Sequence, residues 1–131
     1  MIGNIYRAVA TGHSLTATPS LSGKLSEGPG DVTTRTPQMK AHLALLQCKL
    51  LVTSGSPATV SVWLCSDAAG DQPFTEAQTV NIATGITTAA KRGFGLAIDV
   101  PFQIEGGIYV ACSLNTGEAT AEWNLHFRQG G

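Results

Sequence analysis

Three histidines, His13, His42 and His126, are the first candidates for metal or acid–base chemistry. They lie in separate parts of the chain, without the H-x-H or H-E-x-x-H spacing that brings two imidazoles to one metal ion. His126 falls on the polar face of an expected strand, where a histidine is normally exposed to solvent. We therefore expect no metal site, with a site assembled across the fold as the alternative.

Cys48, Cys65 and Cys112 are an odd set with no short spacing between them. A disulfide framework needs pairs, and a zinc site usually contains two cysteines two to four residues apart. Each of the three cysteines falls within an expected strand. We interpret them as buried, reduced thiols that pack as small hydrophobic side chains.

Asp67, Asp71 and Glu76 share one expected loop, DAAGDQPFTE, and clustered carboxylates can bind calcium. The loop lacks the dense D-x-[DN]-x-[DN]-G spacing of a calcium loop, so we interpret them as solvated acids, with calcium as the alternative. The chain has no G-x-S-x-G motif and no cysteine with a suggestive histidine nearby. Ser113 follows Cys112 in an expected strand and is interpreted as structural. The sequence therefore predicts no enzyme, no cofactor, and no catalytic, cofactor-binding or metal-binding residues.

Trp63 and Trp123 could stack on sugar rings, as aromatic residues do in carbohydrate-binding sandwiches. Trp123 shares a face with Leu125, which predicts a core position. If Val62 and Leu64 face the core, Trp63 between them faces outward. An exposed tryptophan often marks a ligand or subunit contact, and local cover by the chain itself is the alternative.

The composition limits the partners. Charged residues are 13% of the 131 residues, against about 25% in ordinary soluble domains, which suits a surface partly covered by neighbours. The net charge is −1, and the eight Lys and Arg residues are not clustered, so we expect no nucleic-acid partner. No apolar run approaches the ~18 residues of a membrane span, so we expect no membrane partner. The start, MIGNIYRAVATG, lacks the features of a secretory signal, so we expect folding in a cytoplasm.

Alternation of apolar and polar residues predicts the last two strands. Between residues 120 and 128 the pattern has a period of two, which is typical of a strand with one buried face and one solvated face. Alternate residues from Ile108 to Leu114 share one face in the same way. The linking sequence Asn115-Thr116-Gly117-Glu118 is rich in turn residues, so we expect the two strands to form a hairpin.

Four further runs, at residues 43–52, 60–65, 77–83 and 94–100, also resemble strands. The run 43–52 is rich in Leu and Ala and could be a short helix. We predict a strand there because a short Ser-Gly-Ser-Pro turn joins it to the next run. One or two short strands near residues 6–10 would complete the eight strands of a jelly roll. The predicted fold class is therefore all-β: an antiparallel, jelly-roll-like β-sandwich.

We predict that residues 1–38 form an extended N-terminal arm, with one or two short strands, and that residues 39–131 form a sandwich domain. The segment is rich in Gly, Pro, Ser and Thr, and burial of its eight large apolar residues would contribute ~12–24 kcal/mol. Ordering its backbone would cost roughly 40–70 kcal/mol. The arm must therefore add strands to the domain, lie on a neighbouring subunit, or remain a flexible tail. The candidate partner contacts are Ile5, Tyr6, Val9, Leu15, Leu21 and Leu25 of the arm, together with Trp63.

Three features of the sequence carry a resemblance to a known group of proteins. They are the Gly/Ser/Thr-rich arm, the low number of charged residues, and the segment Pro101–Val110, PFQIEGGIYV. The chain resembles the small β-sandwich virion proteins of tailed bacteriophages, particularly the head decoration (cement) proteins. The resemblance covers the whole chain but carries over no residue role. It implies a homotrimer that stabilises the capsid where neighbouring capsomers meet. The implied partner is the major capsid protein or another virion protein, and the implied location is the virion, assembled in the host cytoplasm. The alternative is a receptor- or glycan-binding module of a phage tail or fibre, in which Trp63 makes the contact.

Overall fold

A computed structural model describes residues 5–25, 40–73, 75–82, 91–98, 102–103 and 108–129. Within these residues the elements are all strands: β1 (Ile5–Leu15), β2 (Ser20–Leu21), β3 (Lys40–Ser54), β4 (Thr59–Cys65), β5 (Gln78–Asn81), β6 (Lys91–Ile98), β7 (Phe102–Gln103), β8 (Tyr109–Leu114) and β9 (Glu118–Gln129). Over the described ranges, the structure contains no helix with the length and apolar character needed to cross a membrane.

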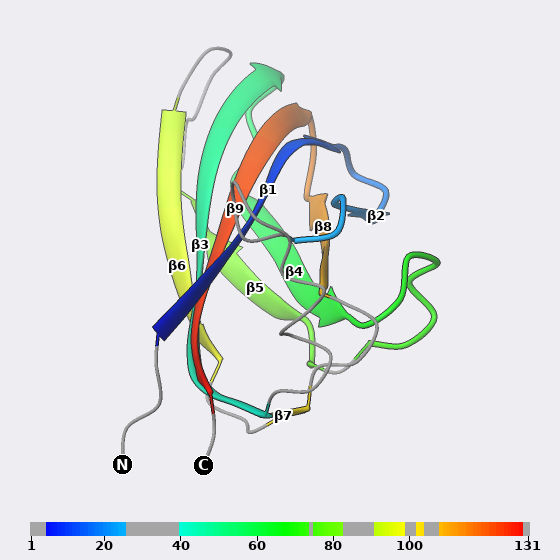
Figure 1. Cartoon of the computed structure of the whole chain (residues 1–131). Helices are drawn as coiled ribbons and strands as arrows, with labels where there is room; N and C mark the ends of the chain where they lie inside the picture. Colours follow the sequence, from blue (N-terminus) through cyan, green and yellow to red (C-terminus); the bar gives the residue numbers. More distant parts are fainter. Residues whose placement is uncertain are drawn as a thin grey trace.

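The strands form two antiparallel sheets that face each other (Figure 1). Sheet A has the order β1-β9-β3-β6, with β7 also paired to β3, and sheet B has the order β2-β8-β4-β5. The first strand pairs with the last, and β2–β8, β3–β6 and β4–β5 follow inward along the chain. The chain is therefore arranged as one long antiparallel hairpin rolled into two sheets, which is a jelly roll. This confirms the predicted fold class.

The leucine-rich segment before residue 54 is a strand, as predicted, and it is the centre of sheet A. β3 pairs with β9 on one side and with β6 on the other. Its side chains alternate: Leu46, Cys48 and Leu50 are buried, whereas Leu45 and Leu51 are exposed. Backbone pairing on both edges, with alternating burial, stabilises the strand despite the modest strand propensity of leucine.

The core lies between the two sheets and contains the residues that the alternation predicted. Trp123 is fully buried, and Phe94 of β6 packs against it edge-on, with 6.0 Å between ring centroids and 78° between the ring planes. Sheet B contributes alternate residues of β4 and β8: Val60, Val62, Leu64, Val110, Cys112 and Leu114. Because aromatic and branched side chains from both sheets interdigitate here, the core joins the two layers.

The predicted hairpin between the last two strands is wrong. β8 pairs with β2 and β4 in sheet B, whereas β9 pairs with β1 and β3 in sheet A. The turn between them crosses from one sheet to the other and packs beside the crossing turn after β3: a Cβ on Gly117 would lie 2.5 Å from the carbonyl oxygen of Ser54. Oδ1 of Asn115 accepts hydrogen bonds from the amides of Ala58 and Thr59 at 2.8 and 3.1 Å. The turn residues are thus correct, but they connect two layers.

The N-terminal segment adds strands to both sheets over its described part, which is the first of the three expected alternatives. β1 is eleven residues long and pairs along β9, while β2 pairs with β8. The backbone amides of Ser22 and Leu25 donate to the carbonyls of Val110 and Ile108, at 2.8 and 2.9 Å. The partner strands supply the hydrogen bonds that the segment could not make alone. Residues 1–4 and 26–39 lie outside the described residues, so the boundary at 38 stays a prediction.

Candidate functional site

Three polar side chains form a hydrogen-bond chain inside the sandwich. Nε1 of Trp123 donates to Nδ1 of His13 at 2.9 Å, and Nε2 of His13 lies 2.9 Å from Oγ of Ser20. Oγ of Ser20 in turn donates to the carbonyl oxygen of Ser14 at 3.1 Å. His13 is 4% exposed and Trp123 is fully buried. Because these side chains come from β9, β1 and β2, the chain of bonds connects sheet A to sheet B.

A β-bulge in β1 directs His13 into the interior. The register with β9 shifts between Ala10 and His13, so that Thr11 and Gly12 together oppose one residue of β9. Gly12 has a φ of 69°, a backbone conformation that residues other than glycine rarely adopt. Ala10 is buried before the bulge, and regular alternation from Ala10, with no bulge, would point residue 13 to solvent.

The hydrogen bonds between Trp123, His13 and Ser20 are arranged in a way that opposes nucleophilic catalysis by Ser20. An indole nitrogen can only donate, so Nδ1 of His13 must be the acceptor and Nε2 carries the proton. His13 therefore donates to the Ser20 hydroxyl, whereas a catalytic histidine must accept the proton of its serine. Burial lowers the pKa of His13 below its ordinary value, and a hydrogen bond to Ser20 only partly offsets this. The neutral imidazole acts as a structural link.

The other histidines lie apart from His13. His42 is in β3, and its side chain is outside the described residues. His126 is half-buried on the outer side of β9, with Nε2 3.2 Å from Oε1 of Gln47. Over the ranges that the structure describes, no group of three or more His, Cys, Asp or Glu residues is arranged to hold a metal ion.

All three cysteines are buried and unpaired with one another, which confirms the interpretation as reduced interior thiols. Burial raises the pKa of Cys112 to about 12 and raises the pKa of Cys48 further. Burial and the nearby Asp67 carboxylate also raise the pKa of Cys65. Because the thiolate is the reactive form, these thiols are poor nucleophiles and poor metal ligands.

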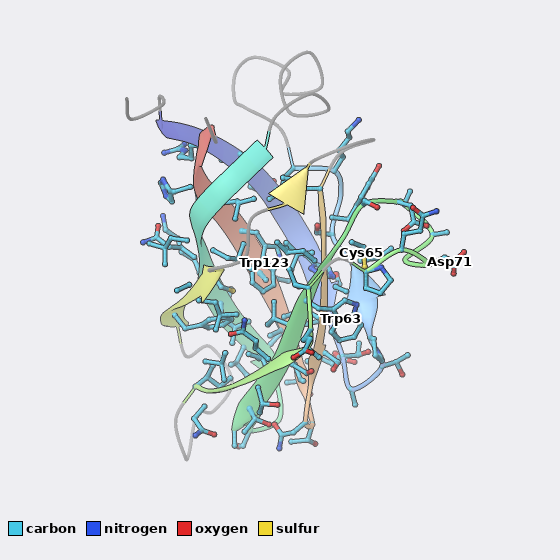
Figure 2. The ribbon with its side chains drawn as sticks, turned by 90° about the horizontal axis from the view of Figure 1, so that it is seen from below. Trp63, Cys65, Asp71 and Trp123 are labelled. Atoms are coloured by element: carbon cyan, nitrogen blue, oxygen red, sulfur yellow. The ribbon has the colours of Figure 1, made fainter. Side chains whose placement is uncertain are left out.

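The acidic loop after β4 uses one of its carboxylates to hold its own shape. Oδ2 and Oδ1 of Asp67 accept hydrogen bonds from the amides of Asp71 and Gln72, at 3.1 and 2.9 Å. Figure 2 shows Asp71 at the outer end of the loop, away from the sheets. Glu76 is exposed in the same loop, shortly before β5. Among the described residues the three acids do not converge on a common point, and Asp67 has a structural role that the interpretation as solvated acids did not include.

Trp63 lies on the outer side of sheet B and is half-buried by the chain itself. Its strand neighbour is Ala111, which pairs in turn with Leu21 of β2. Together with Ala69 and Gly70 of the acidic loop, these residues line a pocket of about 160 Å³. Local cover therefore accounts for much of the burial of Trp63, and a small part of its surface faces this pocket.

The predicted partner contacts lie on different parts of the fold. Leu15 and Leu25 are 1% and 2% exposed and pack in the core of this chain. Their role as partner contacts stays a prediction. Val9 faces outward on sheet A and Leu21 lies outward on sheet B, so the two are on opposite sides of the molecule. Ile5 and Tyr6 are in β1, and their side chains are outside the described residues.

An open groove, which the sequence did not predict, lies on the outer face of sheet A. The groove has a volume of about 680 Å³ and crosses all four strands, with Gly12, Lys49, Leu51, Gly93 and Glu122 among the lining residues. Leu45 and Leu51, which are 39% and 37% exposed, lie on this face. The available signal was the pair of leucines at the polar positions of the alternation in β3, together with the glycines of β6.

No protein-family model and no curated protein matches this sequence. Among solved structures, the chain is similar to FLHE, with a TM-score of 0.49, 14% identity and 97% of each chain covered. It is also similar to the CBM22-1 xylan-binding domain of Xyn10C from Paenibacillus barcinonensis, with a TM-score of 0.46, 10% identity, and 98% and 97% covered. A third similar structure is the coat protein of Tobacco streak virus, with a TM-score of 0.42, 9% identity, and 97% and 88% covered. At these identities and scores, the similarities assign no function to the chain.

Proposed function

We propose that this chain is a non-enzymatic structural protein of a virus particle, and specifically a decoration (cement) protein that binds between the capsomers of a bacteriophage head. The observation that carries the proposal is the outer face of sheet A, which is open and holds a groove of about 680 Å³. Its two exposed leucines and its glycines suit contact with another protein surface.

The interior supports a structural role. The one close serine–histidine pair among the described residues has its proton on the wrong nitrogen for catalysis, and the cysteines are buried with raised pKa values. Jelly rolls occur in capsid proteins and in lectins, so the fold alone agrees with a structural or a binding role without choosing between them.

Binding to an intact shell, and not to its fragments, stabilises the shell by mass action. In this proposal the partner is the major capsid protein or another virion protein, the location is the virion, and assembly takes place in the host cytoplasm. Neither nucleic acid nor a membrane is a partner. The resemblance to decoration proteins also implies that the chain forms a homotrimer. The solution mass of the purified chain tests this oligomeric state separately.

The test uses virus particles that lack this chain. Purified protein is added to them, and genome release on heating is followed with a DNA-binding dye. We expect the full chain to co-sediment with the particles and to raise the temperature of genome release. Failure to co-sediment at saturating concentration would refute the proposal. A variant with Leu45→Ser and Leu51→Ser is expected to bind more weakly, because it removes the exposed apolar side chains of sheet A.

A second candidate function is a glycan- or receptor-binding module of a phage tail or fibre, and the pocket beside Trp63 favours it. Its volume of about 160 Å³ lies below the ~300 Å³ of ordinary ligand pockets, which limits any ligand to a small group. A glycan panel read by tryptophan fluorescence tests this function. Quenching that Trp63→Ala abolishes would support it, and no response across the panel would exclude it.

A further inference from the structure

The two central strands of sheet A carry an acid beside a base on the outer face. Glu122 of β9 and Lys49 of β3 are register partners, and both line the groove. Because this pair holds one charge of each sign, it is self-complementary: it can face an identical pair on a second copy with opposite charges in contact. If a second copy is placed face to face by a two-fold axis that runs between β9 and β3 and parallel to them, β3 of each copy faces β9 of the other. Lys49 of each copy then faces Glu122 of the other.

The outer strands β1 and β6 also fit each other in side-chain size when the same two-fold axis is applied, with β1 of one copy facing β6 of the other. The axis that exchanges β9 with β3 also exchanges β1 with β6, because the sheet order is β1-β9-β3-β6 (Figure 1). The outward side chains of β1 include Arg7 and Val9, whereas β6 presents Gly95 and Ala97. Through the shared register, Val9 lies in the same row as Gly95, and Arg7 lies in the same row as Ala97. The larger side chains of one copy thus meet the smallest residues of the other.

The apolar residues of this face need cover that the described part of the chain does not provide. Leu45 and Leu51 are the large hydrophobic side chains with the highest exposure among the described residues, and both are on β3. In the face-to-face arrangement Leu51 lies over Thr120 of the second copy, and Leu45 lies over His126. Their burial would contribute to association.

We propose that the partner of this face is a second copy of the chain, packed on sheet A about a two-fold axis parallel to β3 and β9. A self-complementary face closes with two copies, so the assembly is a dimer, in contrast to the trimer that the resemblance implies. Four strands ~4.8 Å apart and about eight residues long would bury roughly 1,000 Å² in total, which is near the lower limit for a specific interface. The dimer is therefore weak and depends on concentration. The dimer and the proposed particle contact use the same outer face of sheet A, so a copy that binds a particle through this face is not part of a dimer.

The test measures the mass of the full chain by sedimentation velocity over a range of concentrations, with two charge-reversal variants. We expect the wild-type mass to rise from 13.6 kDa towards twice that value. Lys49→Glu and Glu122→Lys should each raise the dissociation constant more than about tenfold, because each places like charges opposite one another. An equimolar mixture of the two variants should restore dimers, since every facing pair is again opposite in charge.

The mixture separates this contact from effects within one chain, because mixing cannot repair a contact inside either variant. Glu76→Lys makes the same charge change at an exposed position away from sheet A, and should dimerise as the wild type does. Gly95→Gln should weaken the dimer without unfolding, since a Cβ there meets Leu45 at an ordinary 3.5 Å. A wild-type chain that stays monomeric at all concentrations, a mass of three copies, or a mixture that remains monomeric would each overturn the proposal.

Discussion

Nε1 of Trp123 and Nδ1 of His13 are 2.9 Å apart, and this hydrogen bond ties β9 to the bulged part of β1 where water cannot reach either group. Each atom therefore depends on the other, and Ser20 completes the set of partners. A buried polar chain of this kind stabilises the fold only while every member is bonded.

Removal of the indole nitrogen should destabilise the fold. Trp123→Phe leaves Nδ1 of His13 buried without a donor and also leaves a small cavity. We expect a loss of about 2–4 kcal/mol in the free energy of unfolding, measured by urea denaturation. The matched change Trp63→Phe, on the half-buried outer side of sheet B, should cost less than about 1.5 kcal/mol. Equal losses for the two variants would show that the bond to His13 contributes nothing.

Stability should fall at mildly acidic pH because of His13. Its pKa is lowered in the folded state from the ordinary 6.5, so between these two values the unfolded chain binds more protons. The contribution of His13 is complete above pH 6.5 and is lost as the pH falls through the lowered folded pKa. Urea denaturation at a series of pH values measures this slope. His13→Gln should reduce it, and an unchanged slope in His13→Gln would contradict the assignment.

The interior thiols should react only when the chain unfolds. Cys48 and Cys112 are buried and their pKa values are raised, so neither accessibility nor thiolate formation favours reaction. A disulfide-exchange reagent at pH 8 should label the native protein far more slowly than the protein in urea. A Ser56→Cys variant, with its thiol in an exposed turn, should react at the rate of a free thiol and serves as the control. Rapid labelling of native wild-type protein would contradict the described core.

Two glycines with similar backbone angles should differ in their tolerance of alanine. Gly12 and Gly117 have φ values of 69° and 77°, so alanine costs about 1–2 kcal/mol of backbone strain at either position. A Cβ at Gly12 would meet nothing within 4 Å, whereas one at Gly117 would lie 2.5 Å from the carbonyl oxygen of Ser54. We expect Gly117→Ala to lose about 3 kcal/mol or more in urea denaturation, and Gly12→Ala to stay near the strain cost alone. The reverse order would contradict the packing of the two crossing turns.

Deletion of residues 1–37 should prevent folding. In the described part of this segment, β1 pairs along β9, and Leu15 and Leu25 are in the core. The deletion would expose the edge of β9 and leave the space of both leucines empty. Circular dichroism and urea denaturation should show no cooperative transition. A truncated chain that unfolds cooperatively would restore the arm interpretation.

The alternation of residues predicted the buried face of the strands in which it is regular. Trp123 and Leu125 were placed in the core from their period of two, and the leucine-rich β3 was identified as a strand. Pairing partners were harder to predict. Both sheets bury the same kind of face, so the turn at Asn115 gave no sign that it changes sheet, and the expected hairpin was wrong.

The candidate sites depend on the β1 bulge and on the strand order, which cannot be predicted from a single sequence. The β1 bulge adds one residue and directs His13 into the interior, and nothing in the spacing of residues around His13 indicates the bulge. The groove on sheet A arises from residues of four strands that are distant in the sequence, such as Gly12, Lys49 and Gly93. Only the strand order brings them together.

The most direct test of the proposed function is the protein content of purified virus particles. Particles from cells that carry the gene for this chain are purified on a density gradient, and the chain is quantified against the major capsid protein by mass spectrometry. The account predicts that the chain bands with the particles in a fixed ratio to the capsid protein, and that antibodies against it label the heads. A chain that remains in the soluble fraction, with none in the particle band, would contradict the account.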